Sequence, residues 1–326
     1  MVAISHWYLG FVSFGLGDFT TALGHIEQMI TFYDPQKHHH SIVVLRGSDA
    51  GTSALSYAAC ILWCLGYPDQ ALKRSQEALA LAREHNHAFS LVDVLCYASC
   101  LFNVLRRDAP ALKEHAEQML ELSREKSFQG WLGTATMFWG DSLSMLGQVK
   151  EGVAQIQQGM AINLSIGTRC YLSGFYTFLA EGQAKTGQPE EALTTQDKCL
   201  AMIEETSERY CEAELYRLKG ELMLKQGDDA AAEASLHKAI EVARQQKAKS
   251  WELRAATDLA RLWESQGKTE KAHELLAPVY DWFTEGFDTP DLKAALALLR
   301  ELSQDHSVQR LIKIQDLQSS SWSLNN

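Results

Sequence analysis

A glycine recurs along this chain at an almost constant spacing, and this repeat constrains the fold more than any other feature of the sequence. Seven positions share the frame, and they are separated by 49, 40, 41, 40, 40 and 40 residues. A fixed period of this length indicates a solenoid, in which each repeat is one supersecondary unit stacked on the next. The seven positions are Gly17, Gly66, Arg106, Gly147, Gly187, Gly227 and Gly267.

Small residues flank these positions at fixed distances, seven residues before and five residues after. Stretches such as Lys225–Asp228 and Thr186–Pro189 stop one helix and start the next, because glycine suits the left-handed residue after a helix and Asp or Pro suits the following first turn. We predict helix–turn–helix units in which the small residues lie where two antiparallel helices approach closely. The small residues are Gly10, Ala59, Ser99, Gly140, Ala180, Gly220 and Ala260 before the turns, and Ala22, Ala71, Ala111, Gly152, Ala192, Ala232 and Ala272 after them.

These units predict an all-α, right-handed solenoid of seven helix pairs, with a capping helix over 290–302. Residues 1–302 are expected to form one repeat domain, because no linker rich in Pro, Gly or Ser interrupts the units. The extension 303–326 is expected to be helical at first and then disordered. The spacing of 49 residues between the first two turns predicts a long loop, which contains His38–His40.

The pattern resembles a tetratricopeptide repeat (TPR) array, although its units are near 40 residues instead of about 34. Several segments are also similar to the C-terminal repeat region of large bacterial signalling proteins that carry a class III adenylate or guanylate cyclase domain and an AAA-type or STAND-type ATPase domain. The similarity covers roughly residues 1–302, while the cyclase and ATPase modules themselves are absent from this sequence. The segments are Tyr33–Gln36, Leu65–Leu72, Glu212–Leu222, Ala248–Leu262 and Leu276–Thr289.

Composition narrows the classes of partner and compartment. The net charge of −11 argues against nucleic acid, because binding to a phosphate backbone needs a basic stripe. We expect no membrane span, because no apolar stretch approaches about 18 residues, and no signal peptide, because the first residues lack a basic region followed by an apolar one. Seven cysteines, an odd number without the spacing of a disulfide scaffold, favour a reducing cytoplasm.

Motifs for catalysis and cofactor binding are missing from the sequence. The segment Gly47–Thr52 is rich in glycine but is not a phosphate-binding loop, and neither a metalloprotease motif nor a nucleophile elbow occurs. We therefore expect no enzymatic activity and no cofactor.

Two groups of metal-ligating residues leave an alternative open. Consecutive histidines such as His38–His40 seldom point at one centre, so we favour an ordinary loop there. Four cysteines lie on the first helices of neighbouring units and could reach one zinc ion, but cysteine is also an ordinary small buried residue, and we favour packing. These cysteines are Cys60, Cys64, Cys96 and Cys100.

The inner face of the solenoid is the candidate binding groove, lined by residues ten, six and three positions before each turn. It is expected to grade from aromatic at the N-terminal end to charged at the C-terminal end, which suits a partner segment with apolar anchors and salt-bridging groups. The candidate groove residues are Trp63, Cys100, Asn103, Met137, Asp141, Glu181, Arg217, Glu221 and Arg261.

The first helix carries an aromatic cluster without a preceding polar helix to cover it. An uncovered apolar face marks an interaction site or a cut edge, so we expect this helix to dock another domain, another chain or a second copy. The alternative is that these side chains pack against neighbouring helices of the same chain. The residues are Trp7, Tyr8, Phe11 and Phe14.

The sequence thus predicts a non-catalytic protein-interaction or regulatory module of a bacterial signalling system, which binds a peptide or protein segment in its concave groove. The alternative is the sensor arm of a nucleotide-hydrolysing cyclase or ATPase switch, whose catalytic domains lie on a preceding domain or a separate chain. A metal- or redox-responsive module built on the paired cysteines is a third reading.

Overall fold

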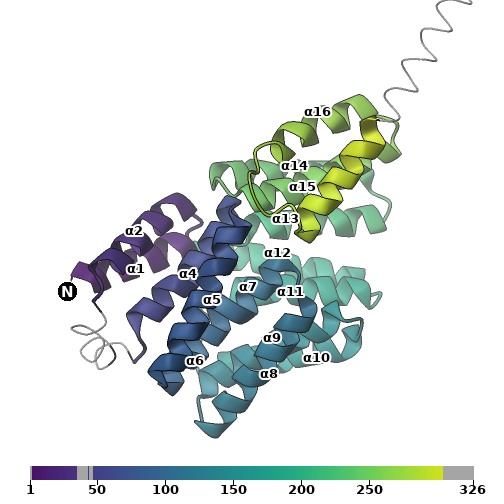
Figure 1. Cartoon of the computed structure of the whole chain (residues 1–326). Helices are drawn as coiled ribbons and strands as arrows, with labels where there is room; N and C mark the ends of the chain where they lie inside the picture. The colour runs from purple at the N-terminus through teal and green to yellow at the C-terminus, as the bar shows by residue number, and fades with distance from the viewer. Residues whose placement is uncertain (1, 35–42, 44–46, 304–326) are drawn as a thin grey trace, which may run out of the picture.

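The computed structural model describes residues 2–34, 43 and 47–303, and over these residues it is a TPR-like α-solenoid without β-strands (Figure 1). Seven helix pairs follow one another along this part of the chain, and a further helix covers 290–303. The prediction of an all-α solenoid of helix pairs is confirmed. Residues His38–His40 and 304–326 lie outside the described residues.

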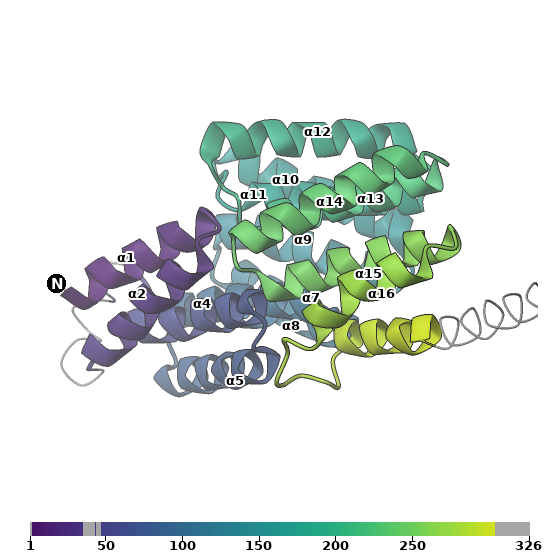
Figure 2. The ribbon, with the colours of Figure 1, turned by 90° about the horizontal axis from the view of Figure 1, so that it is seen from above.

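In each pair the first helix faces the interior of the solenoid and the second lies toward the periphery, as α5 and α12 show in Figure 2. The first helices are α1 (Val2–Gly15), α4 (Ala50–Leu65), the continuous run α6 (Ala88–Val94), η1 (Leu95–Leu101) and α7 (Phe102–Arg106), then α9 (Gln129–Met145), α11 (Leu172–Lys185), α13 (Glu212–Lys225) and α15 (Lys249–Ser265). The second helices are α2 (Phe19–Phe32), α5 (Pro68–His85), α8 (Ala109–Glu125), α10 (Val149–Ser165), α12 (Pro189–Thr206), α14 (Asp229–Gln245) and α16 (Thr269–Tyr280).

The turns between paired helices follow the chemistry expected of them. The six glycines of the repeat frame have φ angles between 74° and 96°, the left-handed region in which only glycine is free of strain. Asp18 and Asp228 then cap the second helices by accepting a hydrogen bond from the amide three residues later. Pro68 and Pro189 occupy the first turn of α5 and α12, where a missing N–H costs nothing.

The third unit departs from the predicted register. The left-handed residue is Arg107, with φ of 58°, whereas Arg106 is the last residue of α7. Seven residues of this unit, Leu95–Leu101, are π-helical, and a π-turn accommodates an extra residue in a helix. The spacing from Gly66 to Arg107 is accordingly 41 residues, and the assignment of Arg106 to the turn, with Ser99 and Ala111 in its frame, was wrong by one residue.

Close approach of paired helices at the small residues is confirmed, most clearly between α9 and α10. A Cβ atom added to Gly140 would lie 2.6 Å from the carbonyl oxygen of Gly152 and 2.8 Å from the amide nitrogen of Ile156. Further along α10, a Cβ on Gly159 would lie 2.9 Å from the amide nitrogen of Met137 in α9. The backbones of α9 and α10 are therefore in direct contact, which a side chain at these positions would prevent.

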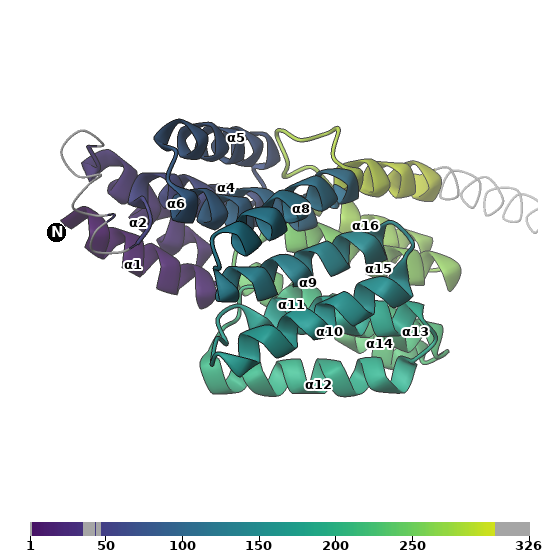
Figure 3. The ribbon, with the colours of Figure 1, turned by 90° about the horizontal axis from the view of Figure 1, so that it is seen from below.

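The solenoid bends far enough for its later units to contact its first three. The carbonyl of Gly15 accepts hydrogen bonds from the amides of Arg209 and Tyr210, at 2.7 and 3.2 Å. The loop after α16 reaches back to the start of α5, where Glu285 accepts from the amides of Asp69 and Gln70 (Figures 2 and 3). Contacts between residues about 200 positions apart thus close the superhelix around an interior.

The prediction that no apolar stretch is long enough to span a membrane was wrong for one helix. The continuous helix Ala88–Arg106 meets the criteria of length and composition for a span. Most of its apolar side chains are buried inside the solenoid, which is the ordinary situation of a core helix.

Candidate functional site

Two cavities of about 410 Å³ each adjoin on the inner face of the solenoid. They share the lining residues Leu101, Gly174, Phe178 and Tyr210, so they form one continuous concave groove. This volume is typical of a ligand pocket. We name them the aromatic cavity and the charged cavity after the side chains that line them.

The aromatic cavity lies between the starts of several first helices. Its rings meet mostly edge to face, as Phe138 and Phe175 do at 5.0 Å between centroids, and this geometry is favourable for aromatic pairs. Nine aromatic side chains line it, and few polar groups interrupt them. The lining residues are Phe89, Cys96, Tyr97, Leu101, Phe128, Gln129, Gly130, Trp131, Thr134, Phe138, Thr168, Cys170, Tyr171, Gly174, Phe175, Phe178 and Tyr210.

Tyr171 has an unusual backbone conformation for a bulky residue at this site. Its φ of 56° is left-handed, which is uncommon for a residue other than glycine, asparagine or aspartate. The carboxylate of Glu208 stabilises this conformation, because it accepts hydrogen bonds from the amide of Tyr171 at 2.6 Å and from the hydroxyl of Ser173 at 2.8 Å. Tyr171 then packs against Tyr97 and Tyr210, at 5.8 and 5.2 Å between ring centroids.

The charged cavity is built on α7, α9, α11, α13 and α15. It combines apolar side chains at the aromatic end with both acidic and basic side chains. The lining residues are Leu101, Val104, Leu105, Arg107, Asp141, Met145, Gly174, Thr177, Phe178, Glu181, Lys185, Tyr210, Cys211, Glu214, Arg217, Leu218, Glu221, Trp251 and Arg254.

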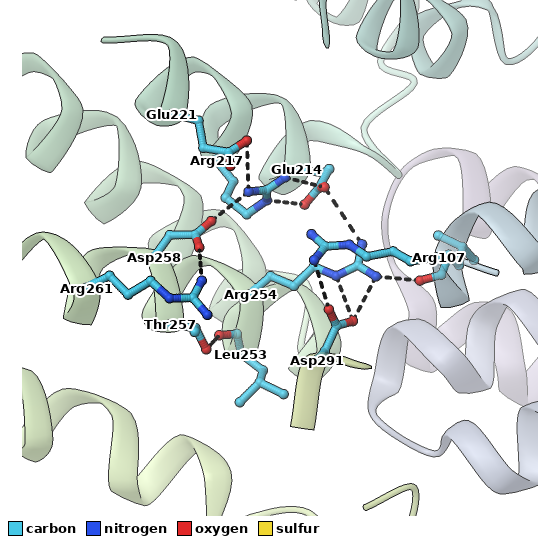
Figure 4. A network of polar contacts seen from close by, with 11 residues as sticks. Arg107, Glu214, Arg217, Glu221, Leu253, Arg254, Thr257, Asp258, Arg261 and Asp291 are labelled. Carbon is cyan, nitrogen blue, oxygen red and sulfur yellow. Dashed lines mark hydrogen bonds and ion pairs between the residues drawn. The ribbon is translucent and has the colours of Figure 1, made fainter. Parts of the chain in front are cut away.

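Buried ion pairs organise one wall of the charged cavity (Figure 4). Arg217 is bonded to Glu214 at 2.8 Å and to Asp258 at 2.6 Å, and Arg254 is bonded to Asp291 at 2.8 Å. Burial alone would raise the pKa of Glu214, but the adjacent guanidinium groups of Arg217 and Arg254 lower it to about 2. This carboxyl is therefore a permanent anion that holds two cations in place.

The ionisation of Asp141, on α9, is shifted in the opposite direction to that of Glu214. Burial and the nearby carboxylate of Glu181 raise the pKa of Asp141 to about 8, while Lys185 acts in the other direction. Lys185 itself is bonded to Glu181 at 2.6 Å. Asp141 is therefore a buried acid that is largely protonated at neutral pH.

Four of the nine predicted groove residues meet in the charged cavity, namely Asp141, Glu181, Arg217 and Glu221. The side chains of Cys100 and Met137 are fully buried in the core, and Asn103 is buried with a hydrogen bond to His115, so these three do not face the groove.

The remaining two predicted groove residues also lie elsewhere. Trp63 is buried against Trp251, at 4.8 Å between ring centroids, and lies under the guanidinium of Arg254. Arg261 is half exposed and pairs with Asp258 at 3.2 Å, outside the residues that line the cavity.

The predicted N-terminal docking face is mostly covered by the chain itself. Trp7 and Phe14 are only 6% and 1% exposed, and both pack on Tyr57 of α4. Phe11 contacts Tyr57 as well, so three of the four predicted residues were wrongly assigned to an open face. Tyr8 is half exposed, and it belongs to an apolar stripe on the other side of α1 made of Val2, Tyr8, Leu9, Val12 and Leu16.

The paired cysteines lie inside the hydrophobic core. Cys60, Cys64, Cys96 and Cys100 are all buried, and burial raises the pKa of each thiol. The thiol of Cys60 donates to the carbonyl of Tyr97 at 3.3 Å. No group of three or more His, Cys, Asp or Glu side chains suited to a metal occurs among the residues that the structure describes.

The aromatic cavity is the part of the site that the sequence reasoning missed. The positions ten, six and three residues before each turn cover only the later part of each first helix, whereas five of the nine rings come from its start or from the residues just before it. A periodic signal exists, because Phe89, Phe128, Trp131, Tyr171 and Tyr210 all lie 16 to 19 residues before a left-handed turn residue.

Comparisons with known proteins agree with this architecture. A family model described as a tetratricopeptide repeat matches residues 171–245. An uncharacterized protein, R02095 of Rhizobium meliloti (strain 1021), is 25% identical over 259 residues, which are 77% of this chain and 24% of the relative. The chain therefore spans about a quarter of the length of this curated relative.

Solved structures with the same fold include a Rap protein complexed with competence and sporulation factor, at a TM-score of 0.59 and 16% identity over 91% of this chain and 75% of that one. Aspartyl phosphate phosphatase F from Bacillus subtilis has a TM-score of 0.53 at 11% identity, over 86% of this chain and 70% of its own. The apo form of RapI has a TM-score of 0.52 at 14% identity, over 92% of this chain and all of that one. At these identities the likeness shows the fold alone, a TPR-like solenoid.

Proposed function

We propose that this chain is a non-catalytic interaction and regulatory module of a bacterial signalling system, and that it binds a peptide or protein segment in its concave groove. The observation that carries the proposal is the pair of adjoining cavities on the inner face. One supplies desolvated aromatic pockets, which suit apolar anchors, and the other supplies charged groups, which set specificity.

The comparisons support the signalling part of the proposal. The Rap protein of similar fold is complexed with competence and sporulation factor, and the Rhizobium relative is bacterial. The seven cysteines are free thiols, which fits the cytoplasm that we propose as the compartment. We further propose that residues 1–302 act as one repeat domain.

A groove-blocking substitution with a matched control tests the proposal. Phe178 lines both cavities and is partly exposed, so Phe178→Glu places a charge inside the groove. Leu164→Glu makes the same kind of change on an exposed position of the peripheral helix α10. Proteins captured by the immobilised wild type are identified by mass spectrometry, and the binding of each purified candidate is then measured by calorimetry against all three forms.

The expected result is a partner that binds the wild type and Leu164→Glu equally and loses binding to Phe178→Glu. Circular dichroism must show that both variants keep the helical content of the wild type. A partner that binds all three forms with the same affinity would place recognition outside the groove and refute the proposal.

A second candidate function is the sensor arm of a nucleotide-hydrolysing cyclase or ATPase switch. The observation that favours it is the length of the Rhizobium relative, of which this chain matches only 24%. A gene for a cyclase or ATPase directly beside that of this chain would favour it further. The decisive measurement is the nucleotide turnover of that enzyme with and without this chain, and an unchanged turnover would exclude the switch.

A further inference from the structure

Asp141 is a buried acidic side chain that faces the charged cavity without a bonded partner. It is 5% exposed, it lines the cavity, and no hydrogen bond or ion pair to it is formed by the residues that the structure describes. The nearest cation, Lys185, is bonded to Glu181 instead. A buried polar group in this situation costs free energy that a suitable ligand group would recover.

The other buried charges of the cavity are matched within the protein. Arg217 has Glu214 and Asp258 as partners, and Arg254 has Asp291 (Figure 4). The acidic groups of the cavity and its ion pairs outnumber the basic groups by one, and Asp141, which is held in its neutral form, is the one acid without a bonded base. The acidic groups are Asp141, Glu181, Glu214, Glu221, Asp258 and Asp291. The basic groups are Arg107, Lys185, Arg217, Arg254 and Arg261.

The group missing from this wall is therefore a cation. The carboxylate of Glu181 repels an anionic ligand and attracts a cationic one, and a cation placed beside Asp141 lowers the pKa of Asp141 so that it ionises as the cation binds. An ammonium or guanidinium group supplies several donors and carries no acceptor, so it satisfies such a pair of carboxyls well.

The position of this wall also constrains what the cation is attached to. The charged cavity shares Phe178 and Tyr210 with the aromatic cavity, so a ligand that reaches Asp141 has apolar rings beside it. Each cavity has the volume of a complete small-molecule site, and the two together suit a chain that presents successive side chains to them.

We propose that the groove binds a peptide segment in which a lysine or arginine lies close in sequence to an aromatic or large aliphatic residue. The basic side chain pairs with Asp141, with Glu181 at its side, and the apolar side chain enters the aromatic cavity. This inference rests on the proposed function, because it assigns the chemistry of the segment that the groove takes. The apolar anchor supplies most of the affinity, and the charge pair supplies specificity.

A library of acetylated and amidated hexapeptides on beads, randomised at every position, tests the inference without knowledge of the natural partner. Selected peptides are resynthesised, and their dissociation constants are measured with the wild type, Asp141→Asn and Asp197→Asn. Asp197→Asn makes the same chemical change at an exposed carboxyl outside the two cavities. We expect selection of a basic residue near an apolar one, and at least tenfold weaker binding to Asp141→Asn only.

The outcomes separate the inference from the proposed function. If peptides bind the groove but carry acidic or neutral residues, or if Asp141→Asn binds them as tightly as the wild type, the assignment of a cation to Asp141 is wrong and the proposed function stands. If no peptide is selected above background, both are wrong. Should Asp141→Asn fail to fold, Glu181→Gln tests the same charge from a more exposed position, with the same expected loss for basic peptides.

Discussion

The contact between α9 and α10 gives the sharpest test of how this solenoid is packed. We predict that Gly140→Ala destabilises the protein although alanine is the better helix former. The added Cβ would lie 2.6 and 2.8 Å from backbone atoms of Gly152 and Ile156, and 2.9 Å from the Cβ of Gln155. Backbone atoms cannot rotate away as a side chain can, so the two helices must separate.

Two opposing effects set the size of the change. Overpacking of a tight core costs about 1–3 kcal/mol. Replacing glycine by alanine inside a helix recovers up to about 1 kcal/mol through backbone entropy. Gly24 in α2 is exposed, and a Cβ there meets nothing within 4 Å, so Gly24→Ala shows the second effect alone. The difference between the two variants therefore isolates the steric cost, expected at about 1–3 kcal/mol.

Equilibrium unfolding in urea, followed by circular dichroism, measures both variants against the wild type. Gly220→Ala should fall between them, because its Cβ meets mainly the side chain of Leu236, at 2.8 Å, which can move. If Gly140→Ala were as stable as Gly24→Ala, the close backbone contact of α9 with α10 would be wrong.

Four further predictions follow from the same structure. Arg254→Met should lower the free energy of unfolding in urea by about 3–5 kcal/mol, because it breaks a buried ion pair. Arg261→Met, at a half-exposed ion pair, should lower it by less than about 1 kcal/mol, and equal losses would contradict the burial of Arg254. Since the pKa of Asp141 is raised to about 8 in the folded state, the wild type should lose stability relative to Asp141→Asn as pH rises from about 4 to about 8, and parallel stability curves would refute the assignment. Leu9→Glu combined with Val12→Glu should abolish a self-association through the exposed stripe of α1, measured by light scattering, and a wild type that is monomeric at high concentration would exclude this contact. The purified chain should show no ATP hydrolysis and no cyclase activity above a mock preparation, and turnover by it would overturn the non-catalytic proposal.

The repeat frame could be predicted from sequence because it depends on local chemistry. Glycine at a left-handed turn and a small residue at a helix crossing are each required by backbone geometry, so Gly147, Gly152 and Gly140 are visible without knowledge of the rest of the fold. The third unit was shifted by one residue because a π-helical turn inserts a residue without changing the composition of the helix.

The site was less predictable because it depends on contacts between distant units. The rule that positions ten, six and three residues before each turn face the groove correctly predicted Asp141 and Arg217. The same rule also included Met137 and Cys100, which neighbouring helices bury. The burial of Trp63 could not be deduced from its own unit, because its packing partners Trp251 and Arg254 come from a unit nearly 190 residues later. The closure of the superhelix brings them together, and a repeat period alone does not fix the curvature that produces it.

Closure and binding use some of the same side chains, and this links them energetically. Arg254 donates to the carbonyl of Leu105 in the third unit, pairs with Asp291 in the helix over 290–303, and lines the charged cavity beside Glu214. A ligand in that cavity therefore contacts the wall that holds the third and last units together. If the ligand binds the closed arrangement more tightly than an opened one, it stabilises closure by the same factor by which closure raises its affinity. The charged cavity is thus the place where occupancy of the groove can be transmitted to the contact between the third and last units.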